Sequence, residues 1–356
     1  MSQREPALVT PFWVRIATET SLSPGWLLVA FPAVLYPTYL LLEVLFGRGL
    51  AAATDFGGDF EARLFPMLAV SLGYISMMYT YVARGTFGDL DALGPVLRGG
   101  EATCASLREQ LIRFERRRWW VGALIGIAVT VVLQELGIAR WTRLLAGDWS
   151  LRDPCLAAIS IGFWIMGGAG SMYLIDSCRV YSRIGERHVQ VDLLDLGPLS
   201  PLTRHGLRIV LLLTIITAAG SIFLLIGYSS RPSVRVSPFV PISVACFWNV
   251  MLASAAFFFP VRGLQRSIRT RKAEKLAEVR EEIRLDHDLV AQRGPESAEA
   301  STRLPGLLAF EKRIESVREW PFDAPTLTRF FLYVAIPLGS WIGGALVERL
   351  LGAALD

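Results

Sequence analysis

Seven stretches of the chain carry no Asp, Glu, Lys or Arg, and they set the limits on how it can fold. They are 16 to 26 residues long and cover 20–42, 64–83, 119–134, 154–175, 209–230, 236–261 and 330–347. A helix needs about 20 largely apolar residues to cross about 30 Å of hydrocarbon, and it satisfies its own backbone polar groups there. The sequence therefore predicts an all-α, polytopic integral membrane bundle of about seven transmembrane helices.

Composition supports this class. Hydrophobic residues make up 53% of the 356 residues and charged residues 19%, whereas soluble domains are about 45 to 50% apolar. The 119–134 stretch is the shortest, so six spans are the alternative if it is re-entrant. The first long apolar stretch begins at Trp26 after a polar and aromatic segment, which predicts an uncleaved signal-anchor.

The distribution of basic residues predicts an orientation. Positively charged loops stay cytoplasmic, and 26 Lys and Arg fall on one side of the predicted spans against eight on the other. This places the N-terminus in the cytoplasm and the C-terminus outside. Arg outnumbers Lys 33 to three, which is typical of a high-GC bacterium, so the predicted location is a bacterial inner membrane. A net charge of only +4 argues against a nucleic-acid partner.

The predicted organisation has four parts. A cytoplasmic or interfacial N-terminal arm (1–25) precedes a six-span bundle (26–261), a cytoplasmic helical hairpin (262–327) and a seventh transmembrane helix (328–352). Within the bundle, the apolar spacing of 101–118 predicts one amphipathic helix that leads into the third span.

The hairpin is predicted from two matching apolar seams. The first arm places apolar residues at helical spacing among charges, namely Ile268, Leu276, Val279, Ile283 and Val290. After a break at Gly294 and Pro295, the returning arm repeats the spacing with Leu307, Phe310, Ile314 and Val317. The two seams are expected to pack in an antiparallel coiled-coil hairpin. Either the two helices pack only against each other, as a stalk, or residues 262–318 also form a surface that binds a second copy of the chain or another protein.

The returning arm meets the last span at a short hinge. Trp320 suits the membrane interface, Pro321 and Pro325 stop the arm, and Asp323 with Thr326 can cap the next helix. Either the hinge passes a tilt of the hairpin on to the seventh span, or it is only the turn through which the chain enters the membrane.

Four residues are candidates for a transport path. Asn249 lies near the middle of the sixth span and Asp176 closes the fourth, and polar groups at membrane depth are costly and often functional. Pro32 and Pro37 would free backbone carbonyls in the first span. The structural alternatives are an interhelical hydrogen bond for Asn249 and kinks that serve packing for the prolines.

Two further patterns have both a functional and a structural interpretation. His188, Asp192, Asp195 and His205 could form a divalent-metal or proton-linked site, although Leu-rich packing capped by polar groups is favoured. Gly122 with Gly126, and Gly339 with Gly343, have the GxxxG spacing of closely packed helices, within the bundle or between copies.

Motifs for catalysis and for cofactors are missing. The sequence contains no HExxH, GxxxxGK[ST] or GxSxG. All three histidines are predicted to lie in loops, so Ser171 in the fourth span has no histidine with which to form a catalytic dyad. An enzyme is therefore the weakest class, and no cofactor is assigned. A channel or transporter of unknown substrate ranks first, and a membrane scaffold or signalling subunit that presents the hairpin is the alternative. The expected partners are the lipid bilayer, further copies of the chain and a cytoplasmic protein.

Overall fold

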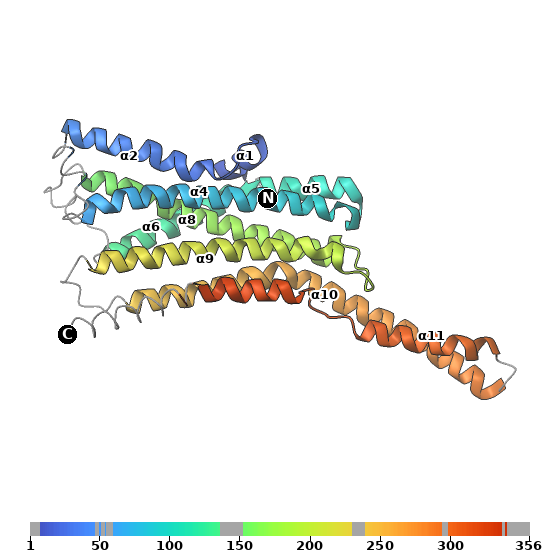
Figure 1. The fold of residues 1–356 in the computed structure, drawn as a ribbon. Coiled ribbons are helices and arrows are strands. Elements are labelled where there is room, and N and C mark those ends of the chain that lie inside the picture. The colour runs from blue at the N-terminus through green and yellow to red at the C-terminus, as the bar shows by residue number, and fades with distance from the viewer. Residues whose placement is uncertain are drawn as a thin grey trace, which may run out of the picture.

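Helices make up nearly all of the structure, which confirms the all-α prediction. The computed structural model describes residues 8–46, 50, 54, 60–135, 152–229, 239–293, 298–336 and 339. The long helices run side by side (Figure 1): α2 (Trp26–Phe46), α4 (Phe60–Leu93), α6 (Arg116–Glu135), α8 (Arg152–Arg183), α9 (Ser200–Ser229) and α10 (Phe239–Arg293). Shorter elements are β1 (Leu8–Val9), α1 (Phe12–Glu19), η1 (Gly94–Val96), α5 (Gly100–Ile112), β2 (Phe114–Glu115), the π-helical η2 (Ile184–His188), η3 (Gly197–Leu199) and α11 (Ala298–Glu315).

Four helical segments of the described chain are long and apolar enough to cross a membrane. They are Trp26–Phe46, Leu64–Val96, Asp153–His188 and Gly197–Ala218. A shorter apolar helix, Ala324–Ile336, follows near the C-terminus. The structure is thus compatible with a membrane protein, and the count of seven spans stays a prediction.

The N-terminal segment packs into the bundle. Trp13 and Val14 of α1 are buried in the main core, and the Trp13 ring lies 5.2 Å from that of Tyr79. Arg84 of α4 donates hydrogen bonds to the carbonyl oxygens of Thr20 and Leu22 just after α1. The part of this arm that the structure describes, from Leu8 onward, is therefore a structural element of the bundle.

The helix predicted over 101–118 is divided in two. Helix α5 ends at Ile112, and β2 precedes α6. Strand β2 pairs with β1 in antiparallel register, with Val9 opposite Phe114, and the Phe114 side chain is buried in the main core. This pairing and the burial of Phe114 outweigh the local helical pattern, because tertiary contacts override propensity.

Helices α6 and α8 approach closely enough for their backbones to touch. A Cβ atom added to Gly122 would lie 2.5 Å from the carbonyl oxygen of Gly168, and one added to Gly126 would overlap the carbonyl of Trp164. The first GxxxG pair therefore packs within the bundle, as predicted. The second pair includes Gly343, which lies outside the described residues.

Helix α11 runs back along the second half of α10, and together they form an arm that projects from the bundle (Figure 1). Residues 262–293 of α10 with α11 are called the arm below. The seam residues Val279 and Ile314 are buried, and Leu276 and Ile283 are half-buried. The two helices of the arm are also joined by ion pairs from Arg280 to Glu311 and Glu315, at 2.6 and 2.7 Å. Residues of both predicted seams are therefore among the buried and half-buried residues of the arm.

The hinge after α11 is built on stacked aromatic rings. Phe257 of α10 stacks on Phe322 and Phe330, with ring centroids 4.5 and 4.4 Å apart. Trp320 stacks on Phe322 at 5.6 Å and meets Phe258 edge-on at 5.7 Å, while Pro321 is half-buried. The hinge thus packs against α10 and against the helix that follows it.

Asp323 caps that helix, as predicted. Its carboxylate accepts a 3.0 Å hydrogen bond from the backbone N–H of Thr326, and bonds from the Thr326 side chain and backbone hold the pKa of Asp323 below its ordinary value. Because the pKa of Asp323 is lower in the folded chain than its unfolded value of about 3.9, the ionised cap stabilises the fold above that pH. This stabilisation is lost as the pH falls through the folded-state pKa.

We expect Asp323→Ala to lose about 1 kcal/mol of local stability at pH 7, and progressively less as the pH falls below about 3.9. Hydrogen exchange of the first backbone amides of 324–336 measures this as faster exchange in the variant, converging with wild type in acid. Asp288→Ala, on the exposed surface of α10, is the control. A difference that persists unchanged at pH 3 would contradict the capping role.

Candidate functional site

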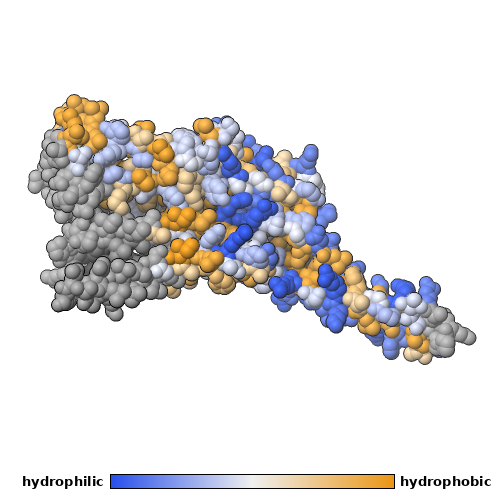
Figure 2. Space-filling view, viewed as in Figure 1, coloured by the Kyte–Doolittle hydropathy of each residue, from blue (hydrophilic) through white to orange (hydrophobic). Residues whose placement is uncertain are grey.

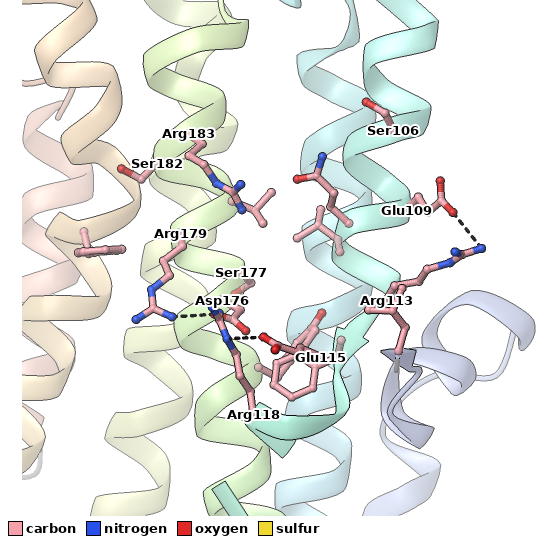
Figure 3. A pocket seen from close by; sticks show the side chains of 17 residues that line it. Ser106, Glu109, Arg113, Glu115, Arg118, Asp176, Ser177, Arg179, Ser182 and Arg183 are labelled. Atoms are coloured by element: carbon pink, nitrogen blue, oxygen red, sulfur yellow. Dashed lines mark hydrogen bonds and ion pairs between the residues drawn. The ribbon is translucent and has the colours of Figure 1, made fainter. Parts of the chain in front are cut away.

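A pocket of about 820 Å³ opens where α5, β2 and the start of α6 meet α8 (Figure 3). Its lining combines polar and charged side chains with apolar ones: Leu8, Ser106, Glu109, Gln110, Leu111, Arg113, Phe114, Glu115, Arg118, Tyr173, Asp176, Ser177, Arg179, Val180, Ser182, Arg183 and Phe259. Strand β2 interrupts the helix between α5 and α6, and residues of all three elements line the pocket.

Asp176 is held between two arginines at this pocket. Arg118 at the start of α6 and Arg179, three residues along α8, both form ion pairs with its carboxylate, the second at 2.9 Å. Arg118 also pairs with Glu115 at 3.0 Å. The Asp176 side chain is 21% exposed. One carboxylate is thus shared by two guanidinium groups, which leaves most of their N–H donors unused because each guanidinium carries five.

Ser177 connects the pocket to a buried polar cluster behind it. Its hydroxyl lies 3.2 Å from Nε2 of His205 on α9, and Nδ1 of His205 lies 3.2 Å from the Thr86 hydroxyl on α4. His205 is fully buried, and its ring stacks on Tyr181 with centroids 4.0 Å apart. The Tyr181 hydroxyl donates a 2.6 Å bond to the carbonyl of Thr86.

The His205 cluster is satisfied in either ring tautomer. A neutral imidazole has one N–H donor and one acceptor nitrogen, and a hydroxyl can serve either role. Ser177 also lies 2.8 Å from the carbonyl of Leu174, and Thr86 lies 2.7 Å from that of Val82. In each tautomer, one hydroxyl accepts the hydrogen bond from the ring N–H and donates its own proton to a carbonyl of its helix. The second hydroxyl donates its proton to the unprotonated ring nitrogen. A tautomer change would therefore exchange the roles of the two hydroxyls.

An ion pair lies one helical turn beyond this cluster. Arg208 of α9 forms a two-pronged pair with Asp89 of α4, and one of the two contacts measures 3.2 Å. The Asp89 side chain is 3% exposed. Gly85 makes room for the guanidinium, since a Cβ there would lie 2.5 Å from it. Helices α4 and α9 are thus joined by both a histidine contact and a charge pair.

Of the transport candidates whose side chains the structure describes, only Asp176 lines the pocket. Pro32 and Pro37 lie inside an unbroken α2 and do not line it. Asn249 lies in α10, and its side chain is outside the described part of the structure.

The predicted loop location of His205 was wrong, because η3 and α9 carry it into the bundle. The companions considered for a metal site have other roles: Asp192 and Asp195 accept 2.9 Å bonds from the backbone N–H groups two residues on. The carbonyl of His188 accepts a bond from the N–H of Arg98. Within the described ranges, no group of three or more His, Cys, Asp or Glu could hold a metal ion.

Sequence reasoning missed Thr86, Asp89, Ser177 and Arg208. The available signal was spacing: Thr86 with Asp89, and His205 with Arg208, are each three residues apart, so each pair shares one helix face. Nothing in a single sequence shows that these two faces meet. Comparisons with protein-family models, with curated proteins and with solved structures gave no match. Fold and site define a helical protein whose apolar helices suit a membrane and whose polar features gather toward the end that carries the arm.

Proposed function

We propose that the protein is a membrane scaffold or signalling subunit that presents the arm to a cytoplasmic partner protein. The observation that carries this proposal is the continuity of α10, which runs for 55 residues from the apolar bundle through Pro260 into the charged arm without a break. At 1.5 Å per residue this is a rod of about 80 Å. Figure 2 is consistent with the membrane placement, because hydrophobic patches lie on the visible bundle away from the arm, whereas the most hydrophilic residues gather where the bundle meets the arm.

The base of the arm is fixed to α8 and η2. A Cβ atom added to Gly263 would overlap the carbonyl of Ser182, so the two backbones touch. Ser267 donates a 3.0 Å bond to the carbonyl of Glu186, and Arg266 lies 3.7 Å from the Glu186 carboxylate. A partner that tilts the arm would therefore move α8 and, through Phe257 and Phe330, the last described helix.

The outer part of the arm also exposes apolar side chains. Leu285, Leu289 and Leu308 are 55%, 39% and 48% exposed, although the seam between α10 and α11 is closed beside them. Leucines outside the seam add nothing to the arm's own packing. They are the residues that we assign to contact with the partner.

The three lysines of the chain make a selective test, because Lys272, Lys275 and Lys312 all lie on the arm. An amine-reactive cross-linker applied to native membranes thus labels the arm and the N-terminal amine. We expect cross-links from Lys275 and Lys312 to one recurrent protein, and a loss of at least fivefold in Leu285→Ser/Leu289→Ser, which removes about 1.5 to 3 kcal/mol of burial per leucine.

The matched control is Glu281→Gln/Asp288→Asn, on the exposed surface of the same helix. Replacement of 273–316 by a short Gly/Ser linker is feasible, because Lys272 Nζ lies 2.8 Å from the carbonyl of Val317. Because that deletion also removes Lys275 and Lys312, its readout is co-purification from detergent extracts: the partner should no longer be recovered while the bundle stays folded. Cross-links confined to the three lysines of one chain in wild type would contradict the scaffold.

Transport is the second candidate, favoured by the polar connection from the pocket through Ser177 to His205. It predicts that Asp176→Asn abolishes flux of ions or small solutes in reconstituted vesicles. Unchanged flux with Asp176→Asn and with Ser177→Ala would remove this candidate.

A further inference from the structure

The charges around the pocket leave one guanidinium without a carboxylate. Four arginines and three acidic residues line it, which gives a net charge of +1. Glu109 pairs with Arg113 at 2.9 Å, and the remaining two carboxylates pair with Arg118 and Arg179. Arg183 has no ion pair or hydrogen bond with any residue of the described chain. In Figure 3 it extends from α8 toward α5, above Arg179. An anion in the pocket would therefore complete its charge balance.

The pocket offers donors to such an anion. Arg179 and Arg183 lie one helical turn apart on α8, and Arg118 of α6 lines the same pocket (Figure 3). Ser106 and Ser182 add hydroxyl groups to the lining. Arginine forks match the oxygen geometry of phosphate and can bind it with two parallel hydrogen bonds.

A buried hydroxyl gives an independent indication of a ligand. Tyr173 lines the pocket and is 2% exposed, and its hydroxyl has no hydrogen-bond partner among the described residues. Buried polar groups nearly always have a partner, and leaving one unpaired costs about 1 to 3 kcal/mol. Because the hydroxyl itself is buried, a ligand oxygen or a water would satisfy it after a small turn of the Tyr173 ring toward the pocket.

The remaining lining is apolar. Leu8, Phe114, Val180 and Phe259 continue the pocket next to the arginines, and the half-buried Trp119 follows Arg118 in α6. Tryptophan beside arginine is typical of the headgroup region of a membrane. Basic pockets between membrane helices on the cytoplasmic side bind anionic headgroups. The lining thus suits a phosphate group that carries acyl chains.

From these observations we propose that the pocket binds a phosphate mono- or diester, with Arg118, Arg179 and Arg183 on its oxygens and Tyr173 at its inner end. The proposal is independent of the scaffold function, because it needs no partner protein. Since Phe259 belongs to α10, a bound ligand would touch the helix that forms the arm.

The test measures binding to the full chain in phosphatidylcholine nanodiscs that contain phosphatidic acid or phosphatidylglycerol, by native mass spectrometry. A separate titration in detergent uses inorganic phosphate. We expect Arg183→Gln to weaken binding roughly tenfold, the value of one charge-assisted hydrogen bond, and Tyr173→Phe to weaken it about fivefold. Among the described residues the Arg183 side chain has no partner and the Tyr173 hydroxyl is unpaired, so both variants should fold.

Arg187→Gln is the matched control, because Arg187 lies one turn farther on, is exposed and does not line the pocket. Binding of lipid alone identifies a headgroup site, and binding of inorganic phosphate with the same loss in Arg183→Gln identifies a site for free phosphate esters. Both results support the pocket. Equal loss in Arg187→Gln and Arg183→Gln, or no loss in Arg183→Gln and Tyr173→Phe, would overturn it, as would the absence of binding by wild type.

Discussion

Gly168→Ala is expected to lower the melting temperature of the purified protein sharply, whereas Gly167→Ala, one residue away, is expected to leave it unchanged or to raise it slightly. Both substitutions replace glycine by alanine inside α8, which gains about 1 kcal/mol of helix propensity. They differ in what the new methyl group meets. At Gly168 it would overlap the carbonyl of Gly122 in α6, and at Gly167 it would meet nothing within 4 Å.

The size of the stability loss depends on which atom the new methyl group would overlap, here the carbonyl oxygen of Gly122. A backbone carbonyl cannot change rotamer, so α6 and α8 would have to separate. Forced insertion of a methyl group into a packed interface costs about 1 to 3 kcal/mol, and separation also weakens the contacts of Gly126 with Trp164. We expect a net loss of about 2 kcal/mol or more for Gly168→Ala. Thermal unfolding in mild detergent, followed by intrinsic tryptophan fluorescence, provides the comparison.

Gly162→Ala supplies a second open site on α8, since nothing lies within 4 Å of a Cβ there. Equal melting temperatures for the variants at 162, 167 and 168 would show that α6 and α8 are farther apart than described. A loss at 168 that appears only at high protein concentration would instead indicate that the small residues join two copies.

The sequence could predict those features that depend on residues close together in the chain. Charge-free stretches located the helices, because a missing charge is a property of each segment alone. Val279 and Ile314, predicted on two seams from their helical spacing among charges, are both buried. Asp323 was correctly assigned as a cap because its hydrogen bond spans three residues.

The features that sequence analysis missed depend on distant contacts. Val9 and Phe114 are far apart in the chain, and their pairing divides a helix that the local pattern favours. His205 follows a turn-rich segment and was placed in a loop, yet its surroundings are Thr86 from α4 and Ser177 from α8. Arg183 was not singled out in the sequence, because its importance follows from a pocket whose lining comes from helices far apart in the chain.

The Asp89–Arg208 pair leads to the second large effect. Removal of one partner leaves the other charge buried, which typically costs 3 to 5 kcal/mol, whereas replacement of both by apolar side chains is often neutral. We therefore expect Asp89→Leu and Arg208→Met each to destabilise the protein by about 3 kcal/mol. The double variant should lose much less than the sum.

Arg204 determines how the two single variants differ. Its Nε atom lies 4.0 Å from the Asp89 carboxylate, and its side chain is 54% exposed. In Arg208→Met it can move toward Asp89 and recover part of the attraction, so this variant should be the milder of the two. In Asp89→Leu both arginines lose their shared carboxylate, and Arg208 is held in place beside Gly85. Denaturation in mixed micelles gives the four free energies of the cycle. Simple additivity would mean that the pair contributes nothing as a pair, and that α4 and α9 are joined instead by the apolar core and by the contacts of His205.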